Sequence, residues 1–229
     1  MDEKAFPQNL AGTVKFYQRH LFVCTGEPDW PDKIDIGGGF VQTLAEALAR
    51  RESEMPLVVK LTACDASPSG TGVDLLLFPD GIRYHGVSER DIPLLVDEQL
   101  VHNRTVPGLR HTRLTGTHIF VCIHQRRDPR CGDCGPRIAD RFEQALREQG
   151  LGNQVTVRRT SHVGGHHHAG NVLIYPDGTW YGRVTTDDVP RIIERHVVGG
   201  QILTDLWRGE MGLTKPEQAA KAAKGTPRE

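Results

Sequence analysis

The stretch HLFVC at residues 20–24 recurs as HIFVC at residues 118–122, an offset of 98 positions. The turn sequence Pro-Asp-Gly likewise occurs at 79–81 and again at 176–178, an offset of 97. One residue gained or lost between matching blocks is a change that a surface loop tolerates. A period this long indicates two copies of a whole domain, because the repeats of solenoid proteins are much shorter.

The second copy shows the order of its elements most clearly. Apolar and β-branched residues at 117–122 predict a first strand. A helix is predicted next, from an apolar face spaced i, i+4, i+7 and i+8 that consists of Ile138, Phe142, Ala145 and Leu146. Three more strands are predicted at 154–160, 172–175 and 179–183. The last two flank the Pro-Asp-Gly turn.

A final helix of the second copy is predicted to begin at the capping pattern Thr185-x-x-Asp188 and to end at Gly199-Gly200. The first copy repeats this order of elements, with a helix at 40–50 and the capping pattern Ser88-x-x-Asp91. The order β-α-β-β-β-α in each copy predicts an α/β fold of two tandem thioredoxin-like domains.

The predicted domains are 1–110, a degenerate copy, and 111–208, the more complete one. Residues 209–229 are rich in Lys, Ala and Glu, and this composition predicts a polar tail that is either disordered or a frayed helix.

Composition limits the classes of function. The net charge of −1 gives no reason to expect nucleic acid as a partner. No stretch approaches the roughly 20 apolar residues that a membrane-spanning helix needs. The start MDEKAFPQNL is polar, unlike a signal peptide, so we expect a cytoplasmic protein. Five cysteines in that compartment favour thiols or metal ligands over disulfides.

Cysteines and histidines of the second copy are predicted to meet at one end of the sheet. Cys122 ends the first strand, and Cys131 follows in the loop, with Cys134 near the helix start. The stretch SHVGGHHHAGN at 161–171 brings His162 and His166 into the loop after the second strand, which emerges at the same end. Two thiolates with two imidazoles are a complete ligand set for a tetrahedral metal.

Gly164-Gly165, between these two histidines, narrows the choice of metal group. Each glycine costs a helix about 1 kcal/mol, so the histidine spacing of a helical zinc site does not apply. A glycine-rich loop instead lets the backbone approach a bulky group and aim N–H groups at it. An iron–sulfur cluster suits such a loop better than a single zinc ion.

The pattern Cys122-x8-Cys131 followed by His162-Val-Gly-Gly-His166 resembles the signature of the sucrase/ferredoxin-like proteins. The similarity extends through HQRRDPRCG at 124–132 and YPDGTWYG at 175–182. It implies a thioredoxin-like ferredoxin domain that holds a [2Fe–2S] cluster on Cys122, Cys131, His162 and His166. No paired carboxylates on a sugar site support the other half of the family's name.

The resemblance implies an electron carrier or redox sensor rather than an enzyme, with an unidentified redox protein as its partner. Two neutral nitrogen donors make a cluster less negative than four thiolates, which raises its potential above the roughly −400 mV of all-cysteine ferredoxins. A ligand histidine whose second N–H can titrate would couple electron uptake to proton uptake.

Two other uses of these residues remain open on the sequence. The same four ligands would hold one zinc ion, or Cys131 and Cys134 would act as a thiol–disulfide pair. His167 and His168 are expected to be exposed or supporting groups. Arg126, Arg127 and Arg130 either form a positive collar round the site or are solvated.

The first copy keeps at most half of the ligand set, so we expect no cluster there. Cys24 matches Cys122, but Lys33 stands where Cys131 does. Cys64 falls near His162, and Pro68 or Ser69 falls near His166.

Overall fold

The computed structural model describes residues 10–225, and its first half is built around the strand that holds HLFVC. That strand, β1, pairs in parallel with β2 and antiparallel with β3. The strands of this half are β1 (Arg19–Cys24), β2 (Val59–Cys64), β3 (Val73–Phe78), β4 (Ile82–Val87) and β5 (His111–Arg113). Its helices are α1 (Gly39–Arg50), η1 (Glu52–Glu54), η2 (Glu89–Asp91), α2 (Ile92–Leu95) and η3 (Val96–Val101).

The second half repeats this arrangement around HIFVC. Strand β6 pairs in parallel with β7 and antiparallel with β8. The strands are β6 (Thr117–Cys122), β7 (Val155–Thr160), β8 (Val172–Tyr175), β9 (Thr179–Tyr181) and β10 (Trp207–Glu210). The helices are α3 (Pro129–Glu148), η4 (His166–His168), η5 (Thr186–Asp188), α4 (Val189–Ile192), η6 (Ile193–Val198) and α5 (Lys215–Gly225). The predicted element order and both predicted capping boxes are confirmed.

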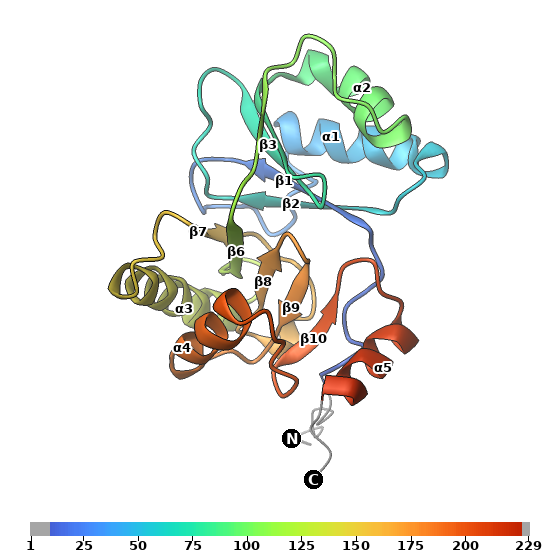
Figure 1. Cartoon of the computed structure of the whole chain (residues 1–229). Coiled ribbons are helices and arrows are strands. Elements are labelled where there is room, and N and C mark those ends of the chain that lie inside the picture. The colour runs from blue at the N-terminus through green and yellow to red at the C-terminus, as the bar shows by residue number, and fades with distance from the viewer. Residues whose placement is uncertain (1–9, 226–229) are drawn as a thin grey trace, which may run out of the picture.

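The two halves share one ten-stranded sheet, in which β2 and β7 are the strands that meet (Figure 1). The pairing of β2 with β7 is antiparallel and its register contains one residue pair, Cys64 with Thr160. Neighbouring contacts strengthen it, since the N–H of Ser161 and the hydroxyl of Thr160 both donate to the carbonyl of Ala63, at 2.9 and 2.8 Å. Each half therefore uses the same edge strand to join the other.

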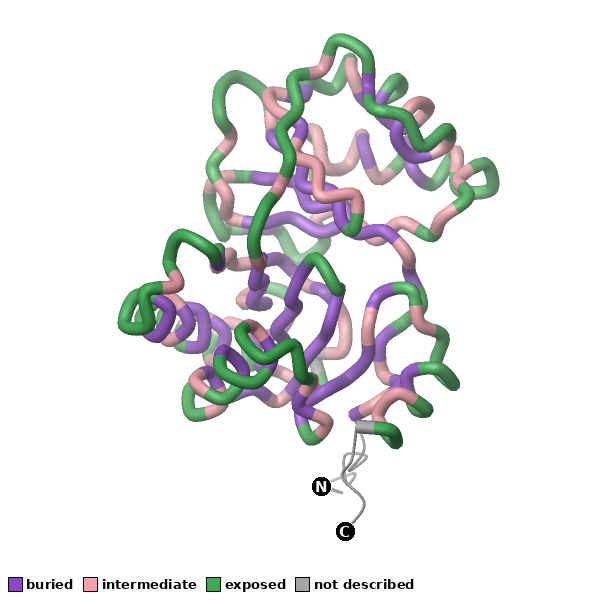
Figure 2. The backbone as a smooth tube through the Cα atoms, viewed as in Figure 1, coloured by how far each residue is buried: buried purple, intermediate pink, exposed green. Residues whose placement is uncertain are grey.

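Side-chain alternation along the central strands produces four layers. Leu21 and Val23 pack with α1 and α2, whereas Ile119 and Val121 pack with α3 and α4. The intervening residues of both strands face a third core between the halves, where the Phe22 and Phe120 rings stack with centroids 3.8 Å apart. Figure 2 shows buried residues along the strands, both buried and exposed residues along the helices, and exposed residues in the outer loops.

The repeat extends one strand further than the sequence predicted. β5 pairs with β4 and thus lies in the first half, although the predicted domain boundary precedes it. β10 takes the matching place beside β9.

Residues 209–225 of the predicted polar tail complete β10 and form α5, so the helical alternative holds for α5 and disorder does not. The helix starts at a capping box, in which the Glu217 carboxylate accepts bonds from the N–H and hydroxyl of Thr214, at 2.7 and 2.6 Å. The buried Gln218 side chain then ties α5 to the body by donating to the carbonyl of Val14. Residues 226–229 of the predicted tail lie outside the described residues.

Within residues 10–225, none of the helices is both long and apolar enough to span a bilayer.

His20 and His118, the second residues of β1 and β6, predict a pH effect on stability. Burial lowers the pKa of His118 to about 4 and the pKa of His20 well below its ordinary value. In the unfolded chain such rings titrate near pH ~6.5. The unfolded state therefore binds more protons between about pH 6.5 and pH 4, and the free energy of unfolding falls as the pH is lowered through this range.

We expect the His118→Gln variant to lose part of this dependence, by about 1 kcal/mol per pH unit below pH ~6. Urea unfolding of both proteins, followed by circular dichroism at several pH values, measures the two slopes. Equal slopes would show that His118 is not a source of the acid sensitivity.

Candidate metal centre

The two predicted cysteine ligands come from the end of β6 and the start of α3. Asp128 caps α3 by accepting a bond from the backbone N–H of Arg130 at 3.0 Å, so Cys131 lies in the first helical turn and not in the predicted loop. Gly135 lets the helix lie close, since a Cβ there would stand 2.3 Å from the carbonyl oxygen of Cys122. Both cysteine side chains are fully buried in the core between the halves.

The side chains of Cys131 and His162 both lie near the thiol of Cys122. The neighbouring Cys131, then His162, holds the pKa of Cys122 well below its ordinary value. The same cysteine pair raises the pKa of Cys131. Two of the predicted ligands, Cys131 and His162, are therefore neighbours of a third, Cys122.

The fourth predicted ligand, His166, has its backbone in the short turn η4, and its side chain lies outside the described part of the structure. His167 in the same turn is exposed and His168 is buried. Among the side chains that the structure does describe, no group of three or more His, Cys, Asp or Glu is gathered closely enough to enclose a metal ion.

His124 is a part of the site that the sequence did not indicate. Its ring Nδ1 accepts the backbone N–H of His162 at 3.0 Å, so the hydrogen lies on Nε2, which donates to the carbonyl of Trp30 at 3.2 Å. Burial lowers the pKa of His124, which fits this neutral tautomer. The ring thus links the His162 loop to the first half.

Arginines beside the cysteines are each paired with a carboxylate. The pairs are Arg126 with Asp29 at 2.9 Å, Arg127 with Asp32 at 3.2 Å and Arg130 with Asp128 at 2.9 Å. Two of these pairs join the halves. The alternative of a positive collar is therefore not favoured, because nearby negative charge offsets each guanidinium.

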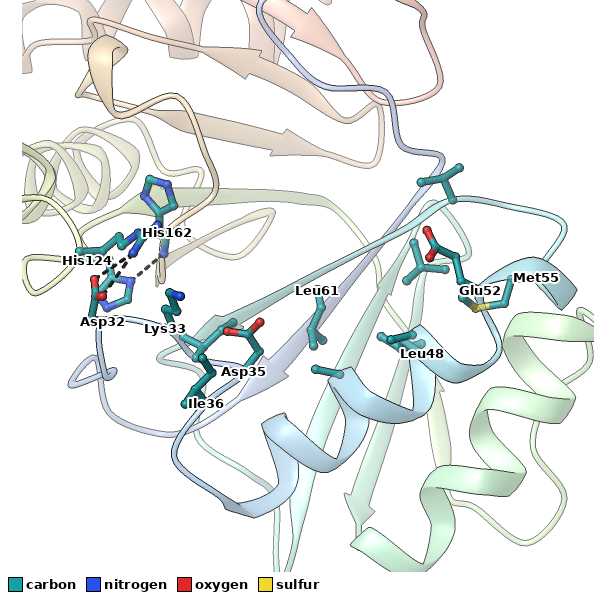
Figure 3. A pocket seen from close by; sticks show the side chains of 16 residues that line it. Asp32, Lys33, Asp35, Ile36, Leu48, Glu52, Met55, Leu61, His124 and His162 are labelled. Atoms are coloured by element: carbon teal, nitrogen blue, oxygen red, sulfur yellow. Dashed lines mark hydrogen bonds and ion pairs between the residues drawn. The ribbon is translucent and has the colours of Figure 1, made fainter.

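An open cavity of about 570 Å³ lies between the halves and reaches His162 (Figure 3). Apolar side chains from α1 and β2, among them Leu48 and Leu61, line one part of it. His124 and His162 lie at the opposite end, with Lys33 between the two parts. The predicted site is thus buried between the halves on its cysteine side and reaches the cavity at His162.

The remaining cysteines are placed differently. Cys134 lies half-buried in α3, and burial raises its pKa. Because the thiol of Cys131 is buried beside Cys122 and its pKa is raised, the pair Cys131–Cys134 is not favoured as a dithiol site. In the first half Cys24 and Cys64 are neighbours on β1 and β2, fully buried with their sulfurs 3.9 Å apart.

Strands and helices follow the same order in the two α/β halves, and the cysteine–histidine site lies at the end of the second half. The sucrase/ferredoxin-like family model matches residues 10–209. This chain belongs to the sucrase/ferredoxin-like family.

Relatives of two kinds are similar to the chain. Altered inheritance of mitochondria protein 32 of Debaryomyces hansenii is 29% identical over 239 residues, which cover 90% of this chain and 87% of that protein. A "Ferredoxin, 2Fe-2S" of Clostridium pasteurianum is 35% identical over 94 residues, 39% of this chain and 92% of the relative. A solved thioredoxin-like [2Fe–2S] ferredoxin from Aquifex aeolicus is 25% identical, with a TM-score of 0.40, covering 44% of this chain and 96% of its own.

Proposed function

We propose that the chain is an electron-transfer or redox-sensing protein with one [2Fe–2S] cluster on Cys122, Cys131, His162 and His166. The placement of Cys131 and His162 near the thiol of Cys122 is the observation that carries the proposal. The donor set fits the group, because two buried thiols and a neighbouring imidazole supply soft and borderline ligands at one end of the sheet. When bound, the cluster would accept and release one electron.

The residues of the chain would have separate tasks. Cys122 and Cys131 would hold the buried side of the cluster, and the first half would exclude water there. His162 borders the open cavity, so its ring can exchange a proton with solvent. Electron uptake at a neighbouring centre favours protonation of such a ring, which would make the midpoint potential depend on pH.

The location and the partner are also part of the proposal. All five cysteines are free thiols, which supports a reducing compartment such as the cytoplasm. The physiological partner would be a redox protein that exchanges one electron with the site.

Ligand-exchange variants test the proposal. We expect purified protein to be red-brown, to bleach with dithionite, and to have a midpoint potential that falls as the pH rises from 6 to 9. His162→Cys and His166→Cys should stay coloured but have lower, less pH-dependent potentials, because a thiolate replaces a titratable neutral ligand. A redox titration followed by visible absorption measures both properties.

His167→Cys is the matched control, since this histidine lies in the same turn and is exposed. It should leave the potential unchanged. A colourless wild-type protein that holds one zinc ion after anaerobic purification would contradict the proposal.

A further inference from the structure

Arg208 is a buried arginine with only neutral partners. It lies on β10 and is 2% exposed. Its guanidinium donates to the hydroxyl and carbonyl oxygens of Thr13 at 3.1 and 3.2 Å, to the carbonyl of Gly164 at 3.2 Å and to the amide oxygen of Asn171 at 2.6 Å. Within residues 10–225 no carboxylate forms an ion pair with it. A buried charge of this kind is costly unless an opposite charge lies nearby.

In the first half, the arginine near the matching position is paired with a carboxylate. Asp74 lies on β3 as the strand partner of Cys24, and Asn171, just before β8, is the corresponding neighbour of Cys122. Asp74 accepts a bond from Arg83 at 2.8 Å, and Arg83 also donates to the carbonyl of Ser67. The first half thus has an arginine with an aspartate where the second half has an arginine with an asparagine.

The cysteines of the candidate site are close neighbours of Arg208. Burial lowers the pKa of Arg208 to about 10, and the nearby side chains of Cys122 and Cys131 oppose this shift. Lys60 is a second cation here, with its Nζ 5.5 Å from the centre of the Trp180 ring, and the Arg208 guanidinium lies 5.4 Å from the same ring. Lys60 also has no carboxylate partner within the described residues.

The lack of a side chain at Gly165 allows the loop to lie against Arg208. The φ of this glycine is +74°, and a Cβ at this position would stand 2.1 Å from a guanidinium nitrogen of Arg208. A Cβ at Gly164 would meet nothing within 4 Å. The second glycine of His162-Val-Gly-Gly-His166 therefore makes room for this arginine.

We propose that Arg208 is the counter-charge of the metal centre and raises the midpoint potential of its cluster. The inference rests on the proposed function. A fixed cation in a buried setting stabilises the reduced, more negative state, and the bond to the carbonyl of Gly164 holds this charge against the loop that carries His162. Arg208 is a positioning and electrostatic residue and does not bind iron.

Asn171→Asp is the sharpest test, because it gives Arg208 the partner that Arg83 already has, with almost no change in side-chain volume. We expect the ratio of reduced to oxidised cluster at a fixed potential to fall about tenfold, a shift of about 59 mV for one electron. In the metal-free protein the same variant should raise the urea midpoint of unfolding, because Arg208 gains an opposite charge.

Asn153→Asp is the matched control. It makes the same substitution at an exposed loop position, where solvent screens the charge, so neither quantity should change. If Asn171→Asp does not retain iron, the midpoint potentials of Arg208→Lys and Arg208→Gln are compared instead, because only Arg208→Gln removes the positive charge. A lower potential in Arg208→Gln than in Arg208→Lys supports the proposal.

An unchanged potential in Asn171→Asp, or equal potentials in the two Arg208 variants, would overturn the counter-charge role and leave the cluster assignment intact. Wild-type protein without iron would instead contradict the proposed function itself.

Discussion

The Cys122→Ser variant should purify colourless and nearly free of iron. Its hydroxyl stays protonated at neutral pH and is a poor ligand for iron–sulfur groups compared with a thiolate. Cys122 is fully buried with Cys131 and His162 near its thiol, so no other residue of β6 can take its place. Visible absorption and iron analysis of the freshly purified protein measure the loss.

Cys24→Ser is the matched control, because Cys24 ends β1 as Cys122 ends β6. It replaces an equally buried thiol in the half where we expect no cluster, and its colour and iron content should equal those of the wild type. Loss of colour in both variants, or in neither, would contradict the assignment of the cluster to the second half.

The Gly135→Ala variant should be both less stable and poorer in iron. The added Cβ would stand 2.3 Å from the carbonyl oxygen of Cys122 and 2.9 Å from the side chain of Ile123. Backbone at the end of a buried strand cannot yield easily, so the overpacking costs about 1–3 kcal/mol of unfolding free energy. The helix start must also move, and Cys131 moves with it. Urea unfolding and iron analysis measure the two effects.

Gly152→Ala controls for the loss of a glycine alone. A Cβ at Gly152 would meet no atom within 4 Å, and the residue lies on the exposed turn before β7. Its stability and iron content should remain within experimental error of the wild type. An equal loss in both variants would show that close packing of α3 on β6 is not the cause.

Local patterns were enough to predict the two similar halves. Ile138 and Phe142 are buried on α3 as their spacing indicated, and Thr185 with Asp188 caps a helix as expected. Each of these signals depends on neighbours within one or two turns of the chain. The family signature predicted the ligand set Cys122, Cys131, His162 and His166, which stays a prediction, and the structure places Cys131 and His162 near the thiol of Cys122.

Contacts between distant elements could not be predicted in this way. His124 bonds to the carbonyl of Trp30 in the other half, and Arg208 reaches Asn171 from β10. Neither contact leaves a periodic signal in the sequence. The sequence repeat also drew attention away from a difference in charge between the halves. Asp74 in the first half and Asn171 in the second occupy matching positions, but only Asp74 carries a charge. The two glycines suggested space for a cluster, whereas the structure shows that Gly165 leaves room for Arg208.

The pairing of β2 with β7 covers a strand edge that the second half would otherwise expose. An unpaired strand edge is a template for association with other chains, and β7 would present one if it stood alone. Separation would also uncover the aromatic surface around Phe120 and Tyr175, which the first half now covers. The first half therefore covers both the strand edge and this aromatic surface, with or without a metal in its own loops.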